Sequence, residues 1–181
     1  MTYPTLSLTE SQTFQALRTV LLTILPSGIE VIRAQDNRVP EPEGNDFVTM
    51  TPIHKARLGN NVSTYTDLFS TGGASTKALL QPTGVDIQLD VHGPNSSDNA
   101  QLITTLLKDQ YATDQFALTG FDVAPLYTSE PRQIPFSDGE QQIEERWVID
   151  VTIQSNPVVT ISQQFASSIS IVLEPVEKLP N

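Results

Sequence analysis

The sequence lacks cysteine and is short of basic residues, and these two shortages exclude several kinds of site. None of its 181 residues is a cysteine, so disulfides and thiolate metal sites are excluded. Lysine and arginine number 10 against 21 aspartates and glutamates, which gives a formal net charge of −11. Ordinary nucleic-acid binding draws most of its affinity from basic groups that meet phosphates. The composition therefore argues against that function.

Long apolar runs, targeting signals and catalytic motifs are also missing. No run reaches the ~18 apolar residues of a membrane span, and the first ten residues do not resemble a signal peptide. There is no G-x-S-x-G, P-loop or dinucleotide fingerprint, and neither His54 nor His92 has a second ligand at metal spacing. The acidic residues between 36 and 46 do not follow the order of an EF-hand loop. We therefore expect no enzyme, no metal and no cofactor.

Two amphipathic helices are predicted. Thr9 and Gln12 have the spacing of a capping box, and the apolar stripe after them ends before Pro26. The stripe consists of Phe14, Leu17, Leu21 and Ile24. Ser96 or Ser97 caps the second predicted helix. Its apolar face consists of Ala100, Ile103, Leu107 and Tyr111.

Several segments alternate apolar and polar side chains, as half-buried strands do. The clearest are Val85–His92 and Trp147–Gln154, and residues 169–173 show the same pattern. Strands with one polar face favour a mostly antiparallel, mixed sheet with the two helices packed on its apolar face. The sequence therefore predicts an α+β fold with two layers.

The length of 181 residues favours one domain that spans the whole chain, 1–181. Within it we expect a flexible N-terminal arm at 1–8, a mobile loop at 69–82 and a C-terminal tail at 175–181. The loop is inferred from the adjacent Gly72 and Gly73 and from its weak periodicity.

A rigid charged crossing is expected between two strands, Ile29–Gln35 and Phe47–Met50. Two prolines one residue apart, at 40 and 42, each fix φ near −65° and favour an extended, polyproline-like segment. A rigid loop between core strands holds recognition groups well at the surface. The candidate interface residues are Arg33, Arg38, Glu41 and Glu43. A solvated connector is the alternative interpretation.

Two stretches carry a recognisable pattern. The first runs from a T-E-x-x-x-F-x-A-L helix into a Q-x-N-R-V-P-x-P-x-G-x-D-F-V segment, and the second is Glu145–Phe165. The matching residues of the first are Thr9, Glu10, Phe14, Ala16, Leu17, Gln35, Asn37 to Pro40, Pro42, Gly44 and Asp46 to Val48. In both stretches the chain resembles phage neck or tail terminator proteins, whereas residues 58–83 are more generic.

This resemblance implies a structural protein of the virion neck, at the top of the tail, that is assembled in the host cytoplasm. It implies a homo-hexameric ring that caps the tail tube, ends its polymerisation and provides a docking surface for the head connector. The implied partners are other copies of the chain, the tail tube protein, a head–tail connector and, in a contractile tail, the sheath protein. DNA would pass through the channel without specific binding, and no membrane is involved.

Two carboxylates are candidates for an acidic, lumen-facing wall of such a ring. Asp86 and Asp90 lie on the polar face of one predicted strand, and an acidic pore repels phosphate. Two other functions stay open at this point. One is a different neck component, such as a connector or stopper on the portal side. The other is a soluble β-rich module that binds carbohydrate or protein.

Overall fold

The structure is a computed structural model that describes residues 3–34, 42–68, 74–134, 136–137, 143–166 and 170–171. Its helices are α1 (Glu10–Ile24), α2 (Ser96–Leu107) and α3 (Gln110–Leu118). Its strands are β1 (Thr5–Leu6), β2 (Glu30–Arg33), β3 (Phe47–Arg57), β4 (Val62–Thr66), β5 (Thr76–Leu80), β6 (Thr83–His92), β7 (Val123–Thr128), β8 (Arg132–Gln133), β9 (Phe136–Ser137), β10 (Ile143–Glu144), β11 (Arg146–Ser155) and β12 (Val158–Ser162). Strands β9 and β10 form a separate two-stranded ladder.

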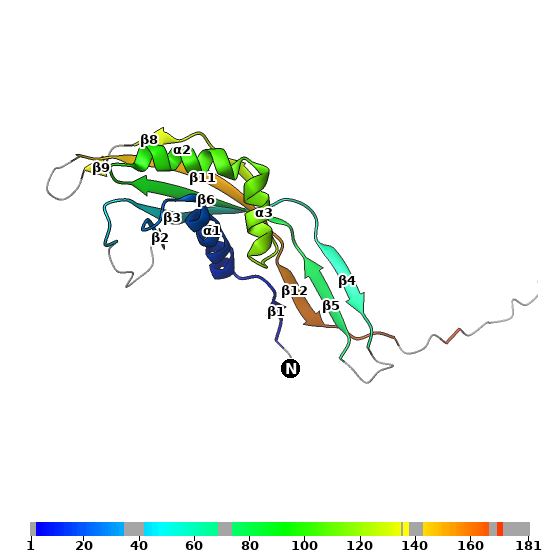
Figure 1. The fold of residues 1–181 in the computed structure, drawn as a ribbon. Coiled ribbons are helices and arrows are strands. Elements are labelled where there is room, and N and C mark those ends of the chain that lie inside the picture. Colours follow the sequence, from blue (N-terminus) through cyan, green and yellow to red (C-terminus); the bar gives the residue numbers. More distant parts are fainter. Residues whose placement is uncertain are drawn as a thin grey trace, which may run out of the picture.

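The main sheet confirms the predicted α+β fold. Its strands follow the order β2-β3-β6-β11-β7, and β8 pairs with one end of β11. Only β2 and β3 run parallel, so the sheet is mixed but mostly antiparallel. The three helices pack on one face of this sheet and leave the other face without a helix (Figure 1).

The alternation predicted for β6 decides which side chains enter the core. Val85, Ile87, Leu89 and Val91 are all buried, and they join one cluster with apolar residues of the helices. The predicted stripe of α1 belongs to the same cluster, and the capping box of Thr9 and Gln12 is formed. Burying such stripes against a sheet is the main source of stability in a fold of this size.

The expectation of two helices is wrong, because a third helix follows the second. Helix α2 ends at Leu107, and the Asp109 carboxylate accepts a hydrogen bond from the Tyr111 backbone N–H at 2.9 Å, which caps α3. Tyr111 therefore lies on a new helix rather than on the last turn of α2. The spacing of apolar residues continues across this break. Hydrophobic periodicity therefore predicted one helix where the structure has two.

A second sheet extends away from the main one, and we call it the arm sheet (Figure 1). Its order is β1-β12-β5-β4, and three of its strands continue central strands of the main sheet. β4 follows β3, β5 precedes β6, and β12 follows β11. Backbone hydrogen bonds hold the junction, from Leu58 N–H to the Pro82 carbonyl at 2.9 Å and from Gln81 N–H to the Pro157 carbonyl at 3.1 Å.

The arm sheet contains parts of two segments that we expected to be flexible. Residues 76–80, which we expected within a mobile loop at 69–82, form β5 and pair on both sides with β4 and β12. Thr5 and Leu6, which we expected in a flexible arm, pair with β12. Backbone pairing explains both differences, since it requires no side-chain periodicity. The predicted tail at 175–181 and most of the predicted strand at 169–173 lie outside the described residues.

Candidate assembly surfaces

The first candidate interface residue, Arg33, interacts mainly with its own chain. Its guanidinium lies over the Phe14 ring at 4.5 Å from the centroid and forms an ion pair with Glu10. The Glu10 carboxylate also accepts a hydrogen bond from Lys55 Nζ at 2.5 Å. That bond and the two nearby cations outweigh the opposing effect of burial, so the pKa of Glu10 lies below its ordinary value. Arg33 therefore helps join β2 to the start of α1.

Of the other three candidate interface residues, the structure describes Glu43. Glu43 is exposed, and its backbone N–H donates a hydrogen bond to the Glu30 carboxylate at 2.8 Å. Arg38 and Glu41 lie outside the described residues. Two members of the candidate set are therefore placed, and of these Glu43 is the more exposed.

Asp46, a residue of the recognised pattern, has a structural role. Its two carboxylate oxygens accept hydrogen bonds from Asn95, one from the backbone N–H at 2.9 Å and one from the side-chain amide at 2.8 Å. Asn95 lies in the turn between β6 and α2, where Gly93 has a φ of 100°. A Cβ on Gly93 would lie 2.3 Å from the Asn45 carbonyl oxygen. The turn therefore requires glycine both for its backbone angle and for space.

Asp86 and Asp90 lie on the helix-free face of β6, as the alternation predicted. Asp90 is only 5% exposed, and its carboxylate accepts hydrogen bonds from Arg146 Nη2 at 2.6 Å and Nε at 3.0 Å. Asp86 is partly exposed and accepts a hydrogen bond from the Thr152 hydroxyl at 2.7 Å. Asp90 is therefore neutralised by a partner on the next strand, and Asp150, on the same face, is paired with Arg132, whereas Asp86 forms no ion pair among the described residues.

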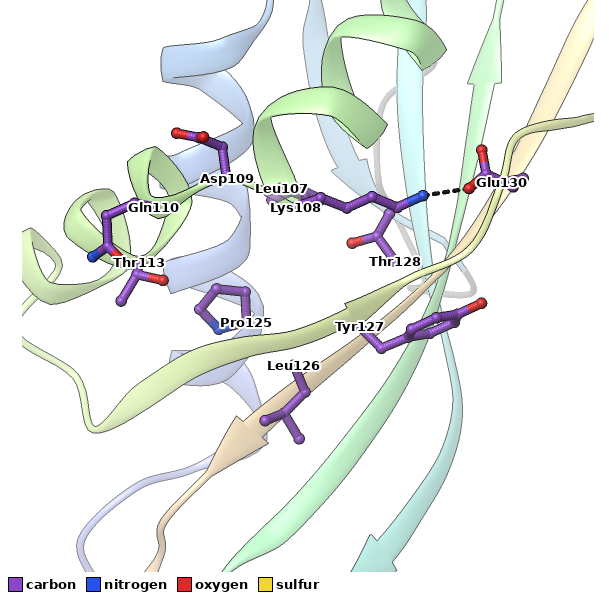
Figure 2. Close-up of a pocket in the computed structure, with 10 residues that line it drawn as sticks. All are labelled: Leu107, Lys108, Asp109, Gln110, Thr113, Pro125, Leu126, Tyr127, Thr128 and Glu130. Atoms are coloured by element: carbon purple, nitrogen blue, oxygen red, sulfur yellow. Dashed lines mark hydrogen bonds and ion pairs between the residues drawn. The ribbon is translucent and has the colours of Figure 1, made fainter.

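An open groove of about 430 Å³ lies where the α2–α3 junction meets β7 (Figure 2). Lys108 and Glu130 form an ion pair at 2.5 Å on one side of it. Leu126 and Tyr127 on β7 are exposed. Its lining combines apolar and polar side chains with the Lys108–Glu130 ion pair and with Asp109, whose carboxylate caps α3, and it contains no histidine. This composition suits contact with another protein better than acid–base chemistry.

Within the part of the chain that the structure describes, no three histidine, aspartate or glutamate side chains gather to hold a metal ion. None of the described helices has the length and apolar character needed to cross a membrane.

The arm sheet is the most unusual surface, and sequence reasoning missed it. Every residue of its four strands is at least partly exposed, and β4 is exposed along its whole length. Lys77 is the one charged residue in these strands. By the pairing register, one face of the sheet gathers the apolar side chains Leu6, Tyr65, Leu79, Val159 and Ile161 together with Ser63 and Lys77, whose ammonium lies over the Tyr65 ring. Phe165 packs edge-on against Tyr65, and no described helix covers this mostly apolar face, which is the kind of surface that protein contacts use.

Comparison with known proteins identifies the family. Residues 11–177 match the family model described as phage neck terminator protein. The chain belongs to this family. The resemblance seen in the sequence is thereby confirmed, and the matched region includes most of the described fold.

Curated proteins and solved structures provide two further comparisons. A comparison with curated proteins gives no match. Among solved structures, the chain resembles the sheath/tube terminator of an extracellular contractile injection system in its extended state, with a TM-score of 0.49 and 13% identity. The match covers 96% of this chain and 65% of the other, so this phage neck terminator spans less than two thirds of that protein's length.

Proposed function

We propose that the protein assembles as a homo-hexameric ring that caps the tail tube, ends its polymerisation and offers a docking surface to the head connector. Membership of the phage neck terminator family supports a structural terminator role. The observation that carries the proposal is the arm sheet, which exposes apolar side chains on an extension of the main fold.

A small sheet of this kind is poorly suited to stand alone in water. Sheets become independently stable when a hydrophobic face is covered by a helix or by a second sheet. The helices of this protein cover the main sheet, whereas the arm sheet extends beyond them (Figure 1). A neighbouring subunit or the tail tube would cover the apolar face, and association would then stabilise the arm and the particle together.

The charge of the chain supports a channel through which DNA passes without binding. The net charge of −11 is multiplied by the number of subunits in a ring, and a negative wall repels phosphate. Asp86 is the better of the two lumen candidates, because Asp90 is already neutralised by Arg146. An electrostatically repulsive, hydrogen-bonded sheet face would let DNA slide rather than stick.

The proposed partners are the tail tube below the ring, the head connector above it and, in a contractile tail, the sheath. The ring would form in the host cytoplasm during assembly and stay in the virion neck. Head-to-tail contacts between two different faces of each subunit would close such a ring.

Inactivating the gene in the phage tests this function. The proposal expects tails of uncontrolled length that do not join heads, and a plasmid copy of the gene should restore both properties. Tails of normal length that fail only at head joining would contradict termination and favour a connector or stopper. Normal infectious particles would contradict both roles.

A further inference from the structure

The two sheets differ in how their edges are protected. The β7 edge of the main sheet contains Pro125, and its pairing with β11 shifts register between Thr152 and Ile153. The opposite edge strand, β2, is short and carries Glu30 and Arg33. Proline, irregular pairing, short length and charge are the devices that stop an edge strand from pairing with another chain.

The β4 edge of the arm sheet has none of these devices. Its sequence, VSTYT, contains no proline, glycine or charge, and all five residues are exposed. Among the described residues, β4 pairs only with β5 and lies at the end of the strand order. Alternate residues of β4 therefore direct backbone N–H and C=O groups away from the sheet, where another strand can pair with them.

The opposite edge of the same sheet is β1. It pairs with β12 at only two positions, Thr5 with Thr160 and Leu6 with Val159. Thr5 and Leu6 are both exposed. The arm sheet therefore ends on one side in β4, a five-residue edge without protective devices, and on the other side in β1, which is even shorter than β2 and directs outward mainly the backbone groups of Leu6.

Strand direction makes these two edges complementary. Each neighbouring pair in the order β1-β12-β5-β4 is antiparallel, so β1 and β4 run in opposite directions. A second copy placed beside the first in the same orientation would bring its β1 against β4 as another antiparallel pair. From this geometry we infer that β4 of one copy pairs through its backbone with the β1 edge of the next copy, so that one sheet runs from subunit to subunit.

The chemistry of the arm favours a second copy as the occupant. Two molecules that each carry a net charge of −11 repel one another over most of their surfaces. The four arm strands carry Lys77 alone, so copies can meet there without opposing carboxylates. The contact is also heterologous, joining one edge to a different edge, which is the type of contact that closes into rings.

Cysteine cross-linking tests this pairing. Because the chain has no native cysteine, only the introduced cysteines can form cross-links. Thr5, Thr160, Ala78 and Thr64 form one row across the arm sheet. Thr5→Cys and Thr64→Cys would therefore lie on the same face, and paired strands bring Cα atoms within disulfide reach. A short bis-maleimide used in parallel tolerates a shift of register.

The full-length double variant, alone and on assembled tails, should give a ladder of covalent multimers on a denaturing gel. Each single variant should stay monomeric, and a mixture of the two single variants should stop at dimers. Dimers from Thr64→Cys alone would overturn the inference, because they would indicate a two-fold β4–β4 contact.

Proline substitutions separate backbone pairing from side-chain contact. The bonds from Gln81 N–H to Pro157 and from Gln163 N–H to Ser75 show that Leu79 faces β12, so its neighbour Ala78 bonds to Thr64. Thr64→Pro therefore breaks the pairing with β5, whereas Ser63→Pro removes an outward N–H and spares that pairing. The Ser63→Pro variant should associate about tenfold more weakly for each backbone hydrogen bond lost. The matched control, Ser63→Ala, keeps the outward N–H and should assemble normally. Equal assembly of both proline variants and the control would overturn the inference.

The inferred strand pairing rests on the proposed ring. An experiment can nevertheless contradict the strand pairing and leave the proposed ring in place. A ring that is intact by light scattering but gives no ladder would overturn strand pairing and leave the proposed function in place. Failure to form a ring, either alone or on tail tubes, would overturn both.

Discussion

The turn after β6 allows a quantitative test, because two glycines share a backbone angle but not an environment. Gly28 has a φ of 96° and Gly93 a φ of 100°, so alanine is strained at both positions. A Cβ on Gly28 would meet nothing within 4 Å. A Cβ on Gly93 would lie 2.3 Å from the Asn45 carbonyl oxygen and 2.6 Å from Asp46 Oδ1. Gly28→Ala therefore isolates the backbone strain, and Gly93→Ala adds the steric clash.

The expected magnitudes differ accordingly. Gly28→Ala should cost about 1–2 kcal/mol of unfolding free energy from strain alone. Gly93→Ala must also displace the turn, and with it the two hydrogen bonds from Asn95 to Asp46 and the one from Gly93 N–H to the Glu145 carbonyl. At about 1 kcal/mol for each of the three weakened bonds, the total becomes about 4–5 kcal/mol. For a chain of this length that lowers the melting temperature by about 10 °C.

Urea unfolding followed by circular dichroism measures both variants against the wild type. We expect Gly93→Ala to lose clearly more unfolding free energy than Gly28→Ala. Equal losses would refute the claim that the chain passes too close to Gly93 for any side chain. They would also contradict the explanation that Asp46, a residue of the family pattern, serves to hold this turn.

Three further predictions concern the charged groups. Asp46→Ala should cost about 1–3 kcal/mol in urea unfolding, because it removes the acceptor of two hydrogen bonds in the turn after β6. Wild type should be more stable than Glu10→Gln at neutral pH, and the difference should vanish as acid protonates Glu10 through its lowered pKa, since Lys55 stabilises only the carboxylate. Arg146→Met should cost about 2–3 kcal/mol because it leaves buried Asp90 unpaired, and adding Asp90→Asn should restore most of the loss in thermal melts.

The sequence predicted well those elements whose signal is local. The Thr9 capping box, the stripe of α1 and the alternation of β6 and β11 all depend on residues close together in the chain, and the structure confirms them. The break between α2 and α3 depends on a single cap at Asp109, and the apolar spacing on either side hid it. Local patterns therefore fixed the type of most elements but not every boundary.

The arm sheet could not be predicted in this way. Its strands follow directly from strands of the main sheet, so the pattern does not reveal where one sheet ends and the other begins. β5 follows a glycine pair and its residues, TKALL, do not alternate, which made it resemble a loop. Its pairing with β4 and β12 is set by strands far away in the sequence.

The candidate site residues show a similar limit. The sequence placed Asp86 and Asp90 correctly on the polar face of one strand. It contained no information on register, and register brings Arg146 to within 2.6 Å of Asp90. Arg33 was expected to face a partner because of its charged neighbours, whereas the fold brings Glu10 and Phe14 against it. Tertiary contacts decide whether a charge is available for recognition.

The most direct test of the central claim is the mass and shape of the purified protein, with and without tail tubes. The account predicts a particle of about 119 kDa, six times the 19.8 kDa chain, by light scattering, and six-fold rings with a central hole in end-on electron micrographs. If the ring needs the tube as a template, the same density should cap tube ends. A strict monomer that tail tubes do not capture would contradict the account.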